Sequence, residues 1–185
     1  LRAPAVSAFG RSFQDLRATV QSAPERTTVQ LNSRELQGDV DWIPPGRGEG
    51  GERGLLQGRL SRLDLTVAAD AKSTGGSAVE SLPDFSFRVD ELLWQGTPWG
   101  RLNFRARNQR SATGESWRVD PFQLDGPDLK FSGRLNWVTR NSGGARRTAP
   151  EQMTALDFKL DSQQVGNLLT RLGFPGTVKR GTAQM

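Results

Sequence analysis

Apolar and polar residues alternate along most of this chain, from Thr27 to Leu160. Successive side chains of a β-strand point to opposite faces of the sheet, so a period of two gives each strand one apolar and one polar face. Strands of this kind are typical of antiparallel sheets that have one face in water. Several alternating stretches are about 10–14 residues long, whereas strands usually have about 5–6 residues. The alternation therefore predicts a mainly β protein built from long antiparallel strands.

The alternation changes phase at two places. Near Arg62 the apolar positions change from even to odd residue numbers, with Leu60 before the change and Leu63 after it. A slip of one residue would turn every later side chain to the other face, so we expect a β-bulge there. Pro121 marks a second slip or a strand edge, because proline has no N–H to donate to a neighbouring strand.

The start of the chain departs from the period of two. Its apolar residues are spaced by three and four, from Val6 through Phe13 to Val20. Residues at this spacing lie on one stripe of a helix. We therefore expect a short N-terminal helix within residues 1–25.

A second helix is expected at residues 162–172. Val165 and Leu168 begin an apolar stripe with helical spacing, and a glycine and a proline follow as stop signals. Asp161 with Gln164 resembles a capping box, in which side chains satisfy the free amides at a helix start. This helix would lie against or within the sheet.

Segments rich in glycine, proline and serine separate the alternating stretches and are expected to be loops. They are residues 43–54, 72–81, 108–115 and 140–152. Beyond the second helix, residues 176–185 are expected to begin another strand.

The residue types argue against an enzyme. The chain has no histidine and no cysteine, which removes the commonest general base, thiolate nucleophiles and the usual zinc ligands. No metal-ligand spacing occurs, and no cofactor is expected. Paired carboxylates are expected on polar strand faces or at turns, where they increase solubility. These pairs are Asp39 and Asp41, Asp84 and Asp90, and Asp125 and Asp128.

Residues 46–51 match the pattern G-x-G-x-x-G. A dinucleotide-binding loop of this kind must lead from a strand directly into a helix. Here the following segment alternates like a strand, so we interpret residues 46–51 as a hairpin loop.

The basic and aromatic residues leave two binding hypotheses to consider. The formal net charge is +5, and a basic surface favours anionic partners. Arg101, Arg105 and Arg107 share a polar strand face, but nucleic-acid stacking requires aromatic residues on that same face. Here the aromatic residues fall on the opposite face, so no nucleic-acid partner is expected. The five tryptophans could stack on sugars, although packing is their more common role.

Eight short segments, taken in order, resemble the C-terminal half of YhdP-type AsmA-like proteins, relatives of TamB in Gram-negative bacteria. They are LQGDVDW (36–42), RLSRLDL (59–65), LPDFSF (82–87), LWQG (93–96), WGRLNFRA (99–106), WRV (117–119), GPDLKFSGRLNW (126–137) and LLTRLGFPGTV (168–178). The order and spacing of these segments carry the resemblance, which covers most of the chain.

The resemblance implies that the 185 residues are one β-groove segment of a much longer periplasmic protein anchored in the inner membrane. It implies long antiparallel strands in a curved, open, groove-like sheet of the AsmA-like (β-taco) type. It also implies phospholipid transport toward the outer membrane, with acyl chains as the bound groups and other envelope proteins as further partners.

One-sided strands agree with this expectation, because a lipid groove needs a continuous apolar surface and a wet outer face. The candidate lining residues are Leu65, Val67, Phe85, Phe87, Val89, Leu102, Phe104, Val119, Leu124, Leu129, Phe131, Leu135, Trp137, Leu156 and Phe158. Some of them are expected to pack under the helices instead.

Two alternatives remain open at this point. The first is a closed β-sandwich that recognises a glycan or an envelope protein and buries its apolar faces against each other. The second is a scaffold for outer-membrane protein assembly that pairs its exposed strand edge with a client.

Overall fold

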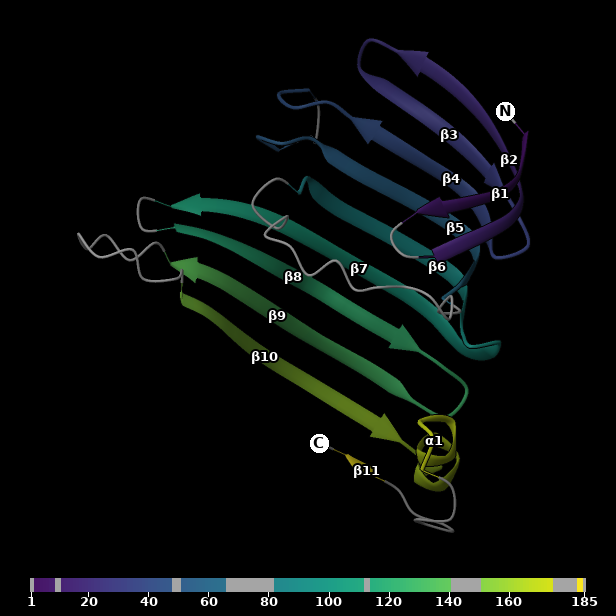
Figure 1. The fold of residues 1–185 in the computed structure, drawn as a ribbon. Helices are drawn as coiled ribbons and strands as arrows, with labels where there is room; N and C mark the ends of the chain where they lie inside the picture. Colours follow the sequence, from purple (N-terminus) through teal and green to yellow (C-terminus); the bar gives the residue numbers. More distant parts are fainter. Residues whose placement is uncertain are drawn as a thin grey trace.

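The computed structural model describes residues 2–8, 11–47, 51–65, 82–111, 114–140, 151–174 and 183–184. Eleven strands pair in one sheet, in the order in which they occur along the chain (Figure 1). The strands are β1 (Arg2–Ala8), β2 (Arg11–Ala23), β3 (Arg26–Asn32), β4 (Leu36–Ile43), β5 (Leu55–Asp64), β6 (Asp84–Trp94), β7 (Thr97–Ser111), β8 (Gly114–Asp125), β9 (Lys130–Arg140), β10 (Glu151–Ser162) and β11 (Ala183–Gln184). One helix, α1 (Val165–Arg171), follows β10.

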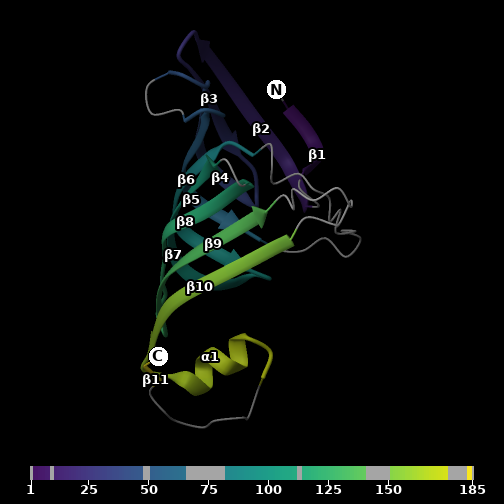
Figure 2. The same cartoon turned by 90° about the vertical axis from the view of Figure 1, so that its left-hand side faces the viewer.

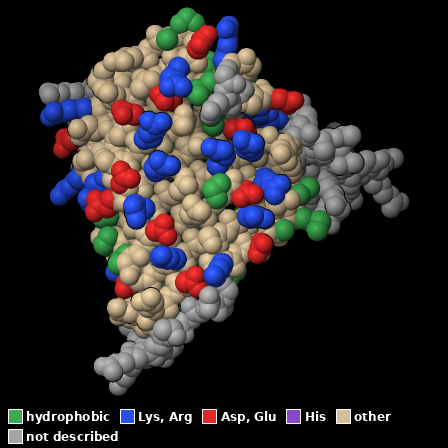
Figure 3. All heavy atoms as spheres, turned by 180° about the vertical axis from the view of Figure 1, so that it is seen from behind, with side chains coloured by type: hydrophobic (Ala, Val, Ile, Leu, Met, Phe, Trp, Pro, Cys, Tyr) green, Lys and Arg blue, Asp and Glu red, His purple; other side chains and the backbone are tan. Residues whose placement is uncertain are grey.

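The sheet is curved and open. β1 and α1 both lie on its concave side (Figure 2). The two edge strands, β1 and β11, do not pair with each other. Seen from behind, the convex face carries many Lys, Arg, Asp and Glu side chains and few apolar ones (Figure 3). The predicted mainly β, groove-like sheet is confirmed, and the described residues contain no second sheet of the kind a closed sandwich requires.

Neighbouring strands are antiparallel with one exception. β5 and β6 are parallel, with Leu60 opposite Val89. The chain therefore crosses from the end of β5 at Asp64 back to the start of β6 at Asp84. The alternation did not predict this pair, because it reports which face a side chain takes and not the direction of the strand.

Both predicted phase slips are confirmed as bulges. Gln37 pairs with Arg62 and Gly38 pairs with Leu60, so β5 has one extra residue at this point. In β8 the register shifts between Val119 and Phe122, on either side of a cis peptide bond before Pro121. Each bulge returns the later apolar residues to the face used by the earlier ones.

The predicted N-terminal helix is wrong, because residues 1–25 contain β1 and β2. A spacing of four residues suits one face of a strand as well as one stripe of a helix. The spacing of three between Phe13 and Leu16 spans Asp15, which has a φ of 52°. The positive φ of Asp15 interrupts the regular strand between Phe13 and Leu16, so this step of three residues is compatible with β2.

The second helix is confirmed within its predicted range, but its predicted cap is wrong. Gln164 is the N-cap residue and its side chain makes no capping hydrogen bond. The Ser162 hydroxyl accepts a hydrogen bond from the Gln164 amide at 3.3 Å and donates to the Asp128 carbonyl at 2.8 Å. The serine thus ties the start of α1 to the turn between β8 and β9.

The predicted loop at 108–115 is shorter than expected, because β7 continues to Ser111 and β8 starts at Gly114. Residues 72–81, most of 140–152 and much of 176–185 lie outside the described residues, although 183–184 form β11.

The core lies on the concave side of the sheet. Four buried side chains form its centre: Leu60, Val89, Leu92 and Leu102. Partly buried apolar residues pack against these four and come from strands β4 to β8 and the residue after β5. They are Leu36, Val40, Leu63, Leu65, Phe87, Trp99, Phe104, Phe122 and Leu124.

Candidate functional site

The strand register aligns the apolar residues of neighbouring strands in rows that cross the sheet. The central row is Val29, Val40, Gly58, Phe87, Phe104, Phe122, Gly133 and Phe158. The row nearer α1 is Leu31, Gly38, Leu60, Val89, Leu102, Leu124, Phe131 and Leu160. The row on the other side is Trp42, Leu56, Phe85, Ala106, Val119, Leu135 and Leu156. Together these three apolar rows form a surface that continues from β4 to β10.

Aromatic rings make contact within and between these rows. Phe87 and Phe104 stack at a centroid distance of 5.6 Å, and Phe85 meets Trp117 edge-on at 5.7 Å. Farther along the sheet, Phe131 and Phe158 stack at 5.6 Å. Such contacts contribute about 0.5–1.5 kcal/mol beyond the burial of their area. The rings therefore form a supported apolar surface.

Two glycines in the central row make room for these rings. A Cβ added at Gly58 would lie 2.3 Å from the ring of Phe87. A Cβ added at Gly133 would lie 3.1 Å from the Cβ of Phe158 and 3.4 Å from the ring of Phe131. The phenylalanines of adjacent strands therefore lie over backbone that carries no side chain.

Burial decreases along the rows toward the C-terminal edge. Val89 on β6 has no exposed area, whereas Leu156 and Phe158 on β10 are 57% and 43% exposed. Phe104 on β7 and Leu135 on β9 are half-buried. The same face thus serves as a core in the middle of the sheet and as an accessible apolar surface at β10.

The structure places the predicted lining residues in three groups. Val89, Leu102, Val119 and Leu129 are buried. Leu65, Phe85, Phe87, Phe104, Leu124, Phe131, Leu135 and Trp137 are half-buried, while Leu156 and Phe158 are exposed. Val67 lies outside the described residues. The half-buried and exposed members can touch a ligand on the concave side, and the buried members support them.

Sequence reasoning missed several residues of this face. Phe122 pairs with Phe104 in the central row. The alternation is interrupted at Pro121, so the sequence did not show which face Phe122 takes. Gly58 and Leu160 carry the alternation and could have been found from it. Trp117 also alternates with Val119, and its place beside Trp137 follows only from the register.

The opposite face is polar. Asp120 lies 3.5 Å from both Arg118 and Arg134, and Arg62 pairs with Glu91 at 2.8 Å. A hollow of about 820 Å³ over β3 to β5 is lined mostly by polar side chains and has no aromatic residue. It lacks the stacking surface that a sugar-binding site commonly uses.

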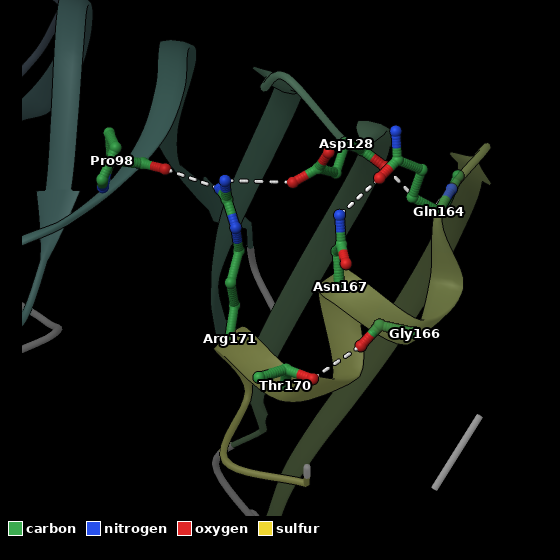
Figure 4. A network of polar contacts seen from close by, with 8 residues as sticks. Pro98, Asp128, Gln164, Gly166, Asn167, Thr170 and Arg171 are labelled. Atoms are coloured by element: carbon green, nitrogen blue, oxygen red, sulfur yellow. Dashed lines mark hydrogen bonds and ion pairs between the residues drawn. The ribbon is translucent and has the colours of Figure 1, made fainter. Parts of the chain in front are cut away.

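Helix α1 is held at one end of the strands by polar contacts (Figure 4). Arg171 Nη2 lies 3.0 Å from Asp128 Oδ2, and Arg171 Nη1 donates to the Pro98 carbonyl at 2.8 Å. These partners belong to the turn between β8 and β9 and to the start of β7. Leu168 of α1 is buried. The helix therefore lies against the strand ends near the row of Leu102 and Leu124.

Two further observations concern the described residues alone. Their only helix, α1, is too short to cross a membrane. They also contain no group of three or more acidic side chains placed to hold a metal ion.

Comparison with known proteins gives one match. The sequence model of the family described as YhdP protein matches residues 1–185, the whole of this chain. No curated protein and no solved structure matches it.

Proposed function

Because the chain belongs to the YhdP family of AsmA-like cell-envelope proteins, we propose that it is a segment of a periplasmic lipid conduit. In this proposal its concave face holds the acyl chains of phospholipids, and the parent protein is anchored in the inner membrane. The conduit supports phospholipid transport between the inner and outer membranes. The segment itself carries out no chemical reaction.

The observation that carries this proposal is the continuity of the three apolar rows. They extend across seven strands, β4 to β10, without an interruption by a charged residue. An acyl chain placed on such a surface gains about 0.8 kcal/mol for each buried CH₂. Because the surface repeats from strand to strand, a chain can move along it without meeting a strongly different environment.

The contrast between the two faces of the sheet supports the same proposal. The convex face carries the ion pairs and remains compatible with water (Figure 3). The concave face leaves Leu156 and Phe158 exposed at β10. Large exposed apolar side chains that adjoin a continuous apolar surface commonly mark a binding site.

Strand β10 offers a matched test of this proposal. Phe158→Glu places a charge on the concave face, and Met153→Glu places the same charge on the convex face of the same strand. Both side chains are accessible, at 43% and 49% exposure, so neither change should unfold the sheet. We expect Phe158→Glu to weaken the binding of a fluorescent phospholipid by about tenfold or more, because a carboxylate in contact with acyl chains is costly.

Met153→Glu should leave lipid binding unchanged. Native mass spectrometry of each purified protein gives a second measure, because lipid carried through purification should be lost only with Phe158→Glu. Absence of lipid binding by the unmodified chain would refute the proposal. An equal loss of binding in the two variants would show that charge in general, and not the concave face, controls it.

A second candidate function is supported by the edge of the sheet. In the described part of the chain, only Asp161 and Ser162 of β10 pair with β11. The remaining edge of β10 has backbone groups that could pair with a strand of a client protein. Crosslinking from Thr154 to envelope proteins would favour this scaffold function over the lipid conduit.

A further inference from the structure

A fourth row of residues borders the three apolar rows at the end of the strands away from α1. It consists of Asn108, Trp117, Trp137 and Thr154 on β7 to β10, and we call it the tryptophan row. Each of its members lies two residues along its strand from a member of the apolar row that contains Val119 and Leu135. The tryptophan row is therefore on the concave face.

The two tryptophans in this row have unpaired hydrogen-bond donors. The Nε1 atoms of Trp117 and Trp137 are buried, and among the described residues neither finds an acceptor. Indole nitrogen is only a donor, and a buried donor without a partner costs about 1–3 kcal/mol. Two such donors on directly paired residues form a site that an oxygen acceptor would satisfy.

Trp99 has the same unpaired nitrogen but a different setting. It packs against the buried core at the opposite end of β7, near α1. It has no second tryptophan opposite it, so the pair of donors occurs only in the tryptophan row within the described sheet.

The neighbours of the pair are mixed in polarity. The apolar row containing Val119 and Leu135 lies on one side, while Asn108 and Thr154 flank the pair within its own row. Tryptophan is favoured where one part of a ligand is apolar and another part is wet. A diacyl lipid changes from apolar to polar at its ester groups, whose carbonyl oxygens are acceptors.

The apolar surface is long enough along the strands to hold an acyl chain. Phe131 and Trp137 lie six residues apart on β9, which corresponds to about 20 Å at about 3.4 Å per residue. One acyl chain fills half of a bilayer core of about 30 Å, or about 15 Å. A chain of this length, lying along the strands, therefore fits between the tryptophan row and the row nearest α1.

Building on the proposed function, we propose that Trp117 and Trp137 bind the ester carbonyl oxygens of a diacyl lipid through their indole N–H groups. The acyl chains then lie along the strands toward α1, and the headgroup lies beyond the tryptophan row. Each nitrogen is covered by other atoms of the chain, so the carbonyl oxygens must displace these atoms. Both indoles are only half-buried as side chains, which leaves their rings room to move.

The test compares two lipids that differ only in this linkage: a diacyl phosphatidylcholine and its dialkyl-ether analogue. The unmodified chain should bind the ester lipid about tenfold more tightly, since the ether analogue lacks both carbonyl acceptors. Trp117→Phe with Trp137→Phe removes the N–H groups and keeps an aromatic, though smaller, ring at each position. This double variant should bind the two lipids equally, and Trp94→Phe, at the other end of the sheet, should retain the ester preference.

Nuclear magnetic resonance of the indole N–H groups gives an independent readout on the unmodified chain. The Trp117 and Trp137 signals should shift with the ester lipid and not with the ether lipid, while the Trp94 signal stays in place. Equal affinity for the two lipids, or indole signals that respond alike to both, would overturn this inference and leave the proposed function standing. Binding of neither lipid would overturn the proposed function and this inference with it.

Discussion

The middle of the concave face and its margin at β10 have the same alternating sequence but differ in burial. Leu60 on β5 is 4% exposed and contributes to the core, whereas Leu156 on β10 is 57% exposed. Both leucines face the concave side, and each pairs with an apolar residue, Leu60 with Val89 and Leu156 with Leu135. The difference comes from what lies above them, because partly buried rings such as Phe87 and Phe104 pack against the core.

This contrast shows how one repeated pattern can stabilise a thin sheet and still leave apolar area accessible. The described residues form one sheet without a second layer on its apolar face, so large side chains of the sheet cover smaller ones. Phe87 covers Gly58 in this way. Toward β10 the covering side chains become fewer and apolar area remains accessible. Core packing and accessible apolar area therefore fall on different strands of the same face.

The largest expected effect tests this assignment directly, with the same substitution in the two regions. Leu60→Ala should lower the free energy of unfolding by about 2–5 kcal/mol, because it leaves a cavity in the core. Leu156→Ala should change it by no more than about 0.5 kcal/mol, as expected at an exposed position. Urea unfolding followed by tryptophan fluorescence measures both values. Similar losses in the two variants would mean that β10 is covered in solution, and the comparison would fail.

The sequence predicted which face of the sheet each of these side chains takes. Alternation placed Phe87, Phe104 and Phe158 on the apolar side, and the structure agrees. It could not predict the degree of burial, because burial depends on which side chains of other strands lie alongside. That information resides in the register, which brings Phe87 beside Gly58 through a parallel pairing.

The same limit explains the remaining differences from the sequence predictions. The spacing of Phe13 and Leu16 fits a helical turn and also a strand with an irregularity, and only pairing with β1 decides between them. Trp117 and Trp137 are twenty residues apart and become neighbours through the register of β8 and β9. Local patterns define the faces of this sheet, whereas pairing between strands defines which side chains lie together in the candidate site.

An intermediate effect on stability is expected at the two glycines of the central row. Replacing each by alanine compares the middle of the sheet with its margin at β10. Gly58→Ala forces a Cβ to within 2.3 Å of the Phe87 ring, which is also stacked on Phe104. We expect it to reduce the free energy of unfolding by about 1–3 kcal/mol, as overpacking does. In Gly133→Ala the nearest atoms are the Asp157 carbonyl oxygen at 3.0 Å and the Phe158 Cβ at 3.1 Å.

Because both of these atoms belong to β10 at the margin, that strand can shift by a few tenths of an ångström. We therefore expect Gly133→Ala to change stability by less than about 1 kcal/mol, with alanine's lower conformational entropy in the unfolded chain offsetting part of the strain. Thermal unfolding of the two variants side by side gives the measurement. A larger loss for Gly133→Ala would place the rigid part of the face at β9 and β10.

A similarly small effect on global stability is expected at α1. The side chains that pack against the four-residue core all come from the strands or the residue after β5, and none comes from α1. Arg171→Ala removes the ion pair with Asp128 and the hydrogen bond to Pro98. It should therefore release the helix while the free energy of unfolding of the sheet falls by less than about 1 kcal/mol.

Hydrogen exchange separates these two consequences. The α1 amides should exchange about ten to a hundred times faster in Arg171→Ala, since a hydrogen-bonded ion pair contributes about 1.5–3 kcal/mol to local order. The amides of β6 and β7 should keep their protection. Arg134→Ala is the control, because its side chain is 66% exposed and lies 3.5 Å from Asp120, where an ion pair contributes little. Loss of protection in β6 and β7 would show that α1 supports the core, and the burial in the middle of the sheet could no longer be attributed to the strands alone.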